Sequence, residues 1–324
     1  TWQDAITCSD KAHNGGYILG GIKYSCNGVS TQAWMVRIDN QGQVLWERCY
    51  GGSGTENIHA IRRTTDGGYI FTGPATSNDG DVIGHHGPTN ADFWVVKTDS
   101  GGAIQWQKCL GGTGSDVPVN IRQTNTGDYI VGGSTQSNDG DVTSGGYGNG
   151  DFWIVKLDGA GSGNILWQQK LGSSAYDVAT DMAPTDGDGC IVVGRVGAAD
   201  GDVSQGISGG NWWIVKLGSN GSLQWERTHS GYGAADQANC ISQTIDGGYI
   251  VLGNMWNPQA TPGIYHGMLK LSATGVTEWS KPVNGYRIIQ TTDFGYATVA
   301  DERKPKNASD KSVNIYLRKF DTQG

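Results

Sequence analysis

Asp66-Gly67-Gly68-Tyr69-Ile70 is the stretch that decides the fold, because close copies of it recur along the whole chain. Glycines followed by a tyrosine and a β-branched residue are typical of a tight turn that leads into a β-strand. Counting residues 66–70 itself, the chain contains six copies of this stretch, so it has an internal repeat. The copies are Gly15-Gly16-Tyr17-Ile18, Gly67-Gly68-Tyr69-Ile70, Gly127-Asp128-Tyr129-Ile130, Asp188-Gly189-Cys190-Ile191, Gly247-Gly248-Tyr249-Ile250 and Phe294-Gly295-Tyr296-Ala297.

Two further patterns accompany these turns. Each turn is followed by an aromatic strand that ends in a basic residue, and then, in five repeats, by a turn and a strand that ends in tryptophan. The terminal tryptophans recur roughly every 60 residues, and such a period indicates a repeat architecture. The aromatic strands are Trp34 to Arg37, Trp94 to Lys97, Trp153 to Lys156 and Trp213 to Lys216, with degenerate copies that end at Lys270 and Lys319; the terminal tryptophans are Trp46, Trp106, Trp167, Trp225 and Trp279.

Each repeat therefore contains four short strands, with the first before the glycine turn and the second beginning at the tyrosine. Four antiparallel strands repeated radially describe one blade of a propeller. We predict an all-β fold, a six-bladed β-propeller with four antiparallel strands per blade, in which residues 1–324 form a single domain. A helical solenoid is excluded, because no segment keeps a helical period.

The sixth repeat stops before its fourth strand. The sequence ends at Asp321-Thr322-Gln323-Gly324, where the turn before that strand belongs. Either Thr1-Trp2-Gln3 supplies a stub that closes the ring, or the precursor continues beyond residue 324. We favour the second interpretation, because Trp2 lies too close to Tyr17 to leave room for a first strand.

Composition and charge exclude several classes of partner. The 53 glycines come with only 8 prolines and with 12 tryptophans, which indicates frequent turns between aromatic-rich strands. The net charge of -8 leaves no basic stripe for phosphates and no attraction to anionic lipid. No apolar run approaches the roughly 20 residues that a membrane-spanning helix needs. We expect neither a nucleic-acid partner nor membrane insertion.

The termini and cysteines bear on localisation. The chain begins at Thr1 and not at methionine, so we expect a processed chain or a fragment, and a removed signal peptide would explain it. The expected localisation is secreted or cell surface. The six cysteines show no zinc-ligand spacing, and their even number permits disulfides. Their pairing stays open, except that Cys49 and Cys109 hold the same repeat position in different blades and are not expected to pair.

The repeat pattern DGGYI, SNDGDV, DFWVVK and a terminal tryptophan resembles repeats of large secreted and surface proteins of bacteria, especially Bacteroidota. The resemblance covers nearly the whole chain and implies a β-propeller and export. The segment from Asp39 through Gly42 to Trp46 is also similar to the tryptophan-docking motif of quinoprotein propellers. Those proteins usually have eight blades and a vicinal disulfide, and this chain has no adjacent cysteines, so their cofactor is not carried over.

Residues that recur at the same position in each repeat are interpreted first as structural. The tryptophans of the third and fourth strands recur in nearly every repeat and are expected to pack between neighbouring blades. The third strand ends in a basic residue in every repeat, and acidic residues recur at the start of the first strand. These charges predict a structural ion pair or a turn cap in each blade, because a buried charge needs such a partner. The acidic residues are Glu56, Asp116, Asp177 and Asp236.

The loops between the second and third strands are long only in repeats 2 to 4, and each long loop contains Asp-Gly-Asp-Val. Two carboxylates on a tight turn can offer oxygen ligands to Ca²⁺. Asp-Gly is also an ordinary turn signal, so the alternative is an Asx turn that stiffens the loop without metal. The candidate calcium ligands are Asp79, Asp81, Asp139, Asp141, Asp200 and Asp202.

Three aromatic residues fall outside the repeat pattern and are candidate ligand-binding residues. Trp212 precedes a repeat tryptophan, whereas Trp256 and Tyr147 lie in loops between second and third strands. Exposed aromatic rings can stack on sugars or on a protein partner, and local packing is the alternative. The His85-His86 pair has no partner ligands in the sequence and is interpreted as part of a solvated loop.

Two classes of function remain. The first is an extracellular, non-catalytic binding or scaffold module that recognises a glycan or a surface protein through its long loops, which rigid scaffolds commonly use for binding. The alternative is a polysaccharide hydrolase or lyase with a sialidase-like architecture, in which Arg62 and Arg122, at matching positions, line the channel. No catalytic serine or metalloprotease motif occurs, which favours the binding module.

Overall fold

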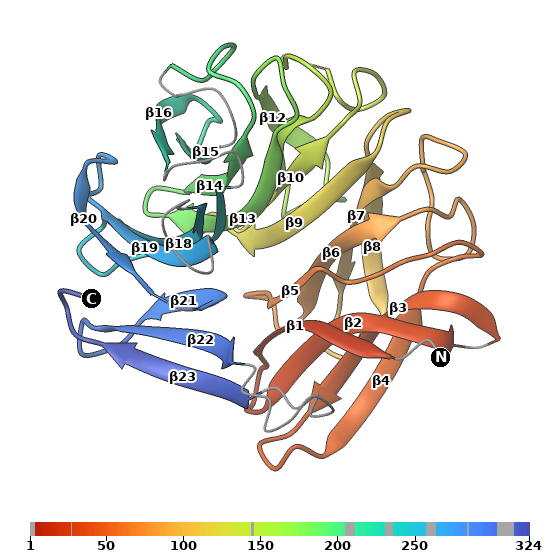
Figure 1. Ribbon diagram of the computed structural model, residues 1–324. Helices are drawn as coiled ribbons and strands as arrows, with labels where there is room; N and C mark the ends of the chain where they lie inside the picture. Colours follow the sequence, from red (N-terminus) through yellow and green to blue (C-terminus); the bar gives the residue numbers. More distant parts are fainter. Residues whose placement is uncertain are drawn as a thin grey trace, which may run out of the picture. The chain divides into compact units, whose positions relative to one another are not determined.

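The computed structural model describes residues 4–26, 28–143, 146–204, 211–230, 236–256, 264–283, 285–302 and 314–324. Their strands form six antiparallel sheets, blades 1 to 6 in chain order (Figure 1). The chain divides into two compact units, Thr1–Gly172 with blades 1 to 3 and Ser173–Gly324 with blades 4 to 6. In the described residues no helix is long and apolar enough to cross a membrane.

The first unit contains twelve strands in three four-stranded sheets, and each sheet follows the order of the chain. Blade 1 consists of β1 (Ala5–Lys11), β2 (Tyr17–Cys26), β3 (Val29–Ile38) and β4 (Val44–Tyr50). Blade 2 consists of β5 (Ala60–Arg63), β6 (Tyr69–Ala75), β7 (Asp92–Thr98) and β8 (Ile104–Leu110). Blade 3 consists of β9 (Asp116–Gln123), β10 (Tyr129–Thr135), β11 (Asp151–Leu157) and β12 (Ile165–Leu171).

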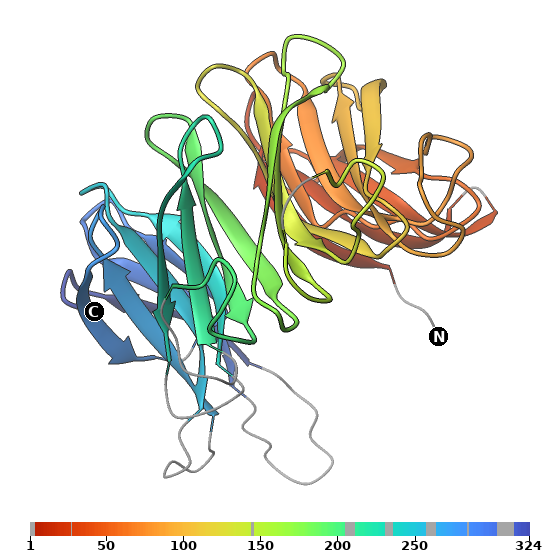
Figure 2. The ribbon, with the colours of Figure 1, turned by 90° about the horizontal axis from the view of Figure 1, so that it is seen from above.

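The second unit repeats this arrangement, and Figure 2 shows the strands of each sheet side by side. Blade 4 consists of β13 (Val178–Thr185), β14 (Gly189–Val196), β15 (Asn211–Leu217) and β16 (Leu223–His229). Blade 5 consists of β17 (Gln237–Gln243), β18 (Tyr249–Trp256), β19 (Ile264–Leu271) and β20 (Thr277–Pro282). Blade 6 consists of β21 (Arg287–Gln290), β22 (Tyr296–Glu302) and β23 (Asn314–Phe320).

The predicted fold class is confirmed: the protein is an all-β, six-bladed β-propeller. Five sheets have four strands, and the sixth has three among the described residues, in line with the expected lack of a fourth strand there. The segment proposed to close the ring, residues 1–3, lies outside the described residues. The strand that begins at Ala5 is the first strand of blade 1, because β1 pairs with β2.

Strand register explains why a basic residue and a tryptophan recur together. In blade 2, Lys97 of β7 lies opposite Trp106 of β8, and Lys156 lies opposite Trp167 in blade 3. The tryptophan then packs on the tyrosine of the next blade. The ring centroids of Trp106 and Tyr129 are 5.9 Å apart. The prediction that these tryptophans pack between blades is confirmed within each unit, because Trp46 with Tyr69, Trp225 with Tyr249 and Trp279 with Tyr296 make the same contact.

Four of the six recurring basic residues form the predicted ion pair, although with a partner from another strand position, whereas Arg37 donates to backbone carbonyl oxygens and the Lys216 ammonium lies 5.5 Å from the Tyr249 ring centroid. Lys97 lies 2.7 Å from Asp66, in the turn between the first and second strands. Partial burial acts to raise the pKa of the Asp66 carboxyl, but the Lys97 ammonium, Thr64 and the Gly68 amide outweigh it and lower the pKa to about 2. The same pair forms between Lys156 and Asp128, Lys270 and Asp246, and Lys319 and Asp293.

The acidic residues at the start of the first strands act as turn caps, the alternative that the sequence left open. The buried carboxylate of Glu56 accepts hydrogen bonds from the Gly52 amide at 3.0 Å and from the Ser77 hydroxyl at 2.6 Å. Asp116 accepts the equivalent bonds in blade 3, and Asp177 of blade 4 accepts from the Ser173 and Gly197 amides. Each cap ties the loop after the second strand to the connection that enters the blade, so the two loops behave as one braced layer.

Candidate functional site

The Asp-Gly-Asp turns hold the long loops against the connections that precede their blades. The first carboxylate of each motif accepts the amide of a Ser or Thr in that connection, at 2.7 Å in all three blades. The second carboxylate accepts a glycine amide, Asp81 from Gly51 at 3.1 Å and Asp141 from Gly111 at 3.3 Å. The three pairs of the first kind are Asp79 with Ser53, Asp139 with Thr113, and Asp200 with Ser174.

The central glycine of the motif is required by the backbone. Gly80, Gly140 and Gly201 all have φ near the left-handed region, at 63°, 64° and 64°. A Cβ atom on Gly140 would also lie 2.4 Å from the carbonyl oxygen of Gly111. The motif is therefore a clasp between a loop and the neighbouring connection, and we call it the Asp-Gly-Asp clasp. Asp202 also has interaction partners in the structure.

This geometry favours the plain-turn interpretation over calcium. Amide hydrogens point at the same carboxylate oxygens that a cation would use, and hydrogen bonds from Thr113 lower the pKa of Asp139. Hydrogen bonds from Ser174 lower the pKa of Asp200 in the same way. Within the described ranges, no group of three or more His, Cys, Asp or Glu side chains is arranged to hold a metal ion.

We therefore expect chelation to leave the protein unchanged. Adding EDTA should not shift the melting temperature, whereas Asp139→Ala should lower the melting temperature slightly, because it removes the bonds from Thr113. Differential scanning calorimetry of both proteins, with and without EDTA, measures both effects. The calcium prediction would be supported instead if EDTA lowered the melting temperature of the wild type and Asp139→Ala abolished part of that response.

Two grooves lie between consecutive blades of the first unit, at equivalent places in the repeat. The first groove has a volume of about 510 Å³ and the second about 490 Å³. Each is bounded by a fourth strand, by the clasp of the following blade and by the next turn between third and fourth strands. The first is lined by Lys23, Glu47, Arg48, Asp81, Gly102 and Ile104; the second is lined by His86, Gln107, Lys108, Asp141, Asn164 and Ile165.

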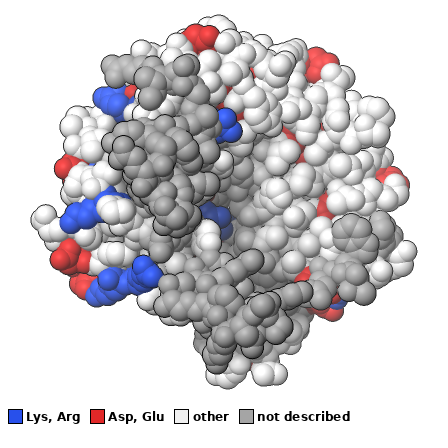
Figure 3. Space-filling model, viewed as in Figure 1, with Lys and Arg blue, Asp and Glu red and all other residues white. Residues whose placement is uncertain are grey.

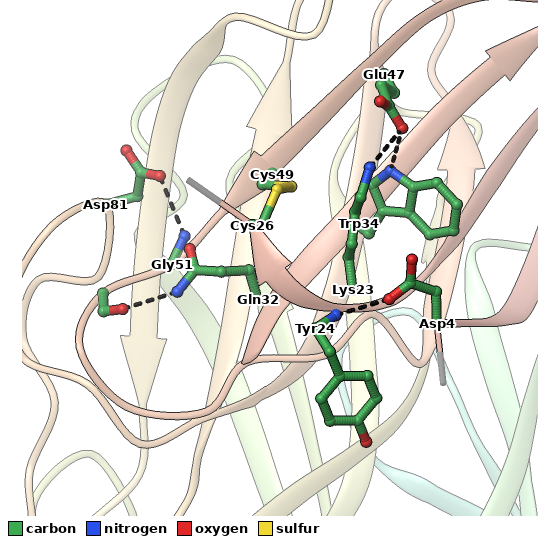
Figure 4. The surroundings of a disulfide bond; sticks show 11 residues. Asp4, Lys23, Tyr24, Cys26, Gln32, Trp34, Glu47, Cys49, Gly51 and Asp81 are labelled. Carbon is green, nitrogen blue, oxygen red and sulfur yellow. Dashed lines mark hydrogen bonds and ion pairs between the residues drawn. A yellow bond between two sulfur atoms is a disulfide. The ribbon is translucent and has the colours of Figure 1, made fainter. Parts of the chain in front are cut away.

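The first groove is stiffened by a disulfide between Cys26 and Cys49 (Figure 4). It joins the tip of the β2–β3 hairpin to β4, and both sulfur-bearing residues line the groove. Beside it, Glu47 accepts bonds from Lys23 at 3.0 Å and from the Trp34 indole at 2.9 Å. The short hairpin of blade 1 is thus locked by a crosslink where blades 2 to 4 use the clasp.

The second groove contains a histidine between two carboxylates. His86 Nδ1 lies 2.9 Å from the buried Asp92, and Nε2 lies 3.5 Å from Asp141 of the following blade. The interpretation of this segment as a solvated loop holds for His86, which is exposed, and is wrong for His85, which is buried with its Nε2 2.6 Å from the Asn90 carbonyl oxygen. Both rings contact residues of their own blade, and His86 alone of the two also reaches a carboxylate of the next blade, Asp141.

Cys109 in the second groove is not a nucleophile. Burial raises the pKa of its thiol, and the nearby Asp92 and Asp141 carboxylates raise it further, so the sulfur stays protonated. The thiol is therefore not activated for covalent chemistry in this groove.

The structure separates the three predicted ligand-binding aromatics. Trp212 is fully buried, packs on His229 at 5.4 Å and donates to the Asn254 carbonyl oxygen at 2.8 Å, so it cannot stack on a ligand and follows the local-packing alternative. Tyr147 is 50% exposed and stays a candidate. Trp256 ends β18 with its backbone opposite Ile264, and its side chain lies outside the described residues.

The arginines considered for a sialidase-like channel are strand residues with structural neighbours. Arg62 of β5 donates to the side chain of Asn120 at 2.9 Å and to the Ile61 carbonyl oxygen. Arg122 occupies the matching place in β9, opposite Ile130 of β10. The sequence pattern does not identify Arg48 and Lys108, the basic residues of the grooves, as candidate site residues. The feature that could have identified them is their shared position, two residues after a repeat tryptophan.

Comparisons with known proteins place the fold and nothing finer. No family model matches the chain, and no curated protein matches it. The Pan2 WD40 domain of Neurospora crassa is similar in structure, with a TM-score of 0.55 and 8% identity over 92% of this chain and 73% of that one. Sqt1 from Chaetomium thermophilum has a TM-score of 0.50 and 12% identity, over 98% of this chain and 72% of that one. The fold is shared. A protein of unknown function from Bacteroides caccae has a TM-score of 0.48 and 11% identity, over 87% of this chain and 83% of that one.

Proposed function

We propose that this protein is an extracellular, non-catalytic binding module that recognises a glycan or a surface protein through the braced loops and grooves of blades 1 to 3. The observation that carries the proposal is the pair of equivalent grooves, each of about 500 Å³ and each lined by polar and apolar side chains together. Volumes of roughly 300–1,000 Å³ are typical of small-molecule sites. The clasps fix the loops beforehand, which lowers the entropic cost of binding.

Two further features support an extracellular setting and selective recognition. The Cys26–Cys49 disulfide is the kind of crosslink that persists in oxidising compartments. On the face that Figure 3 shows, charged side chains of both signs are scattered among wide uncharged areas. Recognition there would depend on individual groups and not on a broad charged field.

Blocking the grooves should abolish binding without affecting folding. Ile83 is 67% exposed at the second groove and Ala103 is exposed at the first. We expect a glycan-array screen of the wild type to give a defined set of hits, and Ile83→Arg with Ala103→Arg to weaken them by about tenfold or more, or roughly 1.4 kcal/mol. The control is Gln41→Arg, an exposed turn position of blade 1 that lines neither groove.

The same screen tests the competing functions. New reducing ends released from a bound polysaccharide would support the hydrolase alternative. Hits that survive the groove variants and disappear with Gln41→Arg would place the site outside the grooves and contradict the proposal. If no glycan binds, the glycan form of the proposal fails and recognition of a protein remains.

A further inference from the structure

The basic residues of the two grooves differ from the buried lysines of the first unit, because Arg48 is exposed and Lys108 is half-buried. Lys97 and Lys156 each face a carboxylate of a neighbouring turn, and the buried Lys170 faces Asp151 at 3.3 Å. These charges are neutralised inside the protein. Arg48 and Lys108 hold one repeat position on β4 and β8, and both line a groove.

Neither groove cation is neutralised by the chain where the structure describes it. Arg48 donates through Nε to the Gly101 carbonyl oxygen at 2.6 Å, and no carboxylate lies within 4.0 Å of its guanidinium among the described residues. Lys108 has no hydrogen bond or ion pair with any described residue. Each groove therefore presents an unpaired positive charge, in a protein whose net charge is -8.

The remaining groups of the grooves suit a hydroxyl-rich ligand. Asp81 and Asp141 use one carboxylate oxygen, Oδ2, in their clasp contacts, which leaves Oδ1 to accept a hydroxyl. Asn164 is exposed in the second groove. Gln107 is occupied, because it accepts from the Trp94 indole at 2.9 Å and donates to the Ile83 carbonyl oxygen at 3.0 Å, and so it forms part of the wall.

We propose that the two grooves are tandem subsites for an anionic polysaccharide, whose carboxylate or sulfate groups pair with Arg48 and Lys108 while its hydroxyls donate to Asp81 and Asp141. The inference rests on the proposed binding function and names its ligand class. A cation that meets an anionic group forms a charge-assisted hydrogen bond, which is stronger than a neutral one. Because the subsites repeat with the blades, a polymer with regularly spaced acidic sugars can occupy both at once.

The wall glycines keep the subsites open. A Cβ atom on Gly102 would lie 2.7 Å from Arg48 Cδ, and one on Gly163 would lie 2.7 Å from the Trp106 ring. Both glycines have φ angles near the left-handed region, 82° and 72°. The turn between third and fourth strands therefore reaches the groove without a side chain that would fill it.

The test measures binding of matched charged and uncharged polymers by isothermal titration calorimetry. Oligogalacturonate and its methyl ester form the carboxylate arm, and dextran sulfate and dextran form the sulfate arm. We expect the charged member of at least one pair to bind and its uncharged partner to bind about tenfold more weakly or not at all. Raising the salt concentration should weaken the charged complex, because screening acts on exposed charges.

Matched variants assign the effect to the grooves. Arg48→Gln and Lys108→Gln should each weaken binding of the charged polymer by about tenfold, and the double variant should lose more than either single one. The control is Lys281→Gln, which removes the same charge at the same repeat position on β20, exposed and outside both grooves. Unchanged melting temperatures of all variants would show that folding is intact.

The outcomes separate this inference from the proposed function. Equal binding of charged and uncharged polymers, or equal weakening by Lys281→Gln, would overturn the anionic-ligand inference and leave a glycan-binding module in place. Binding that is lost in Ile83→Arg but kept in the Arg48→Gln and Lys108→Gln double variant would do the same. Absence of binding to every polymer would overturn both.

Discussion

Replacing Trp94 by alanine should lower the unfolding free energy by about 3–5 kcal/mol, the range for a large aromatic removed from a core. The side chain is fully buried in a cluster that combines Ile18 and Met35 of blade 1 with residues of blade 2. Its ring meets Phe71 edge-on at 5.5 Å, and its indole donates to Gln107 at 2.9 Å. Alanine would leave a cavity between two blades and an unpaired amide oxygen.

The matched control is Trp34→Ala, at the same repeat position in blade 1. Trp34 is only partly buried, with the Lys23 ammonium 4.8 Å from its ring centroid and with Glu47 as partner of its indole. We expect a loss of about 1 kcal/mol there, as for a contact near the surface. Urea unfolding followed by tryptophan fluorescence and circular dichroism compares the two. Similar losses in both variants would contradict the assignment of Trp94 to a core between blades.

The architecture could be predicted because the sequence pattern of one blade recurs six times along the chain. The glycine turn, the basic residue and the tryptophan each recur at a fixed offset, and the register that places Lys97 opposite Trp106 follows from that spacing. The sequence also predicts a structural role for the recurring charged residues. Their partners could not be predicted, because Asp66 is close to Lys97 only after the turn brings the first and third strands to the same edge of the blade.

Trp212 shows how a repeat position can be mistaken for an exception. The sequence presents it as an extra aromatic before the repeat tryptophan Trp213, yet Phe93 and Phe152 hold the equivalent place in blades 2 and 3. All three side chains are fully buried. Successive residues of a strand face opposite sides of its sheet, so a blade packed on both sides buries both members of such a pair.

The grooves could not be predicted because their walls come from different blades. Lys108 and Asp141 are separated by more than half a repeat in the sequence and meet only when two blades pack together. His86 likewise finds Asp92 in its own blade and Asp141 in the next. Periodicity identifies what each blade needs for itself, whereas a site between blades depends on substitutions at positions that the repeat leaves variable.

Removing the disulfide should cost about 3 kcal/mol, the second large effect that we expect. Cys26 and Cys49 are 23 residues apart, so the crosslink closes a loop of that length and lowers the conformational entropy of the unfolded chain. The double variant Cys26→Ser with Cys49→Ser should unfold at lower urea concentration than the wild type. A reductant should lower the stability of the wild type by a similar amount and leave the double variant unchanged.

Cys109→Ser provides the matched control, because Cys109 holds the repeat position of Cys49 but is a buried free thiol. That variant should keep the full sensitivity to reductant, whatever the cost of its buried hydroxyl. Alkylation of the denatured protein should label four cysteines without reductant and all six after reduction. If all six were labelled in both conditions, or if the wild type were insensitive to reductant, the crosslink would be absent from the folded protein. The tip of the blade 1 hairpin would then lack a covalent link to β4, and the support for an oxidising compartment would fall with it.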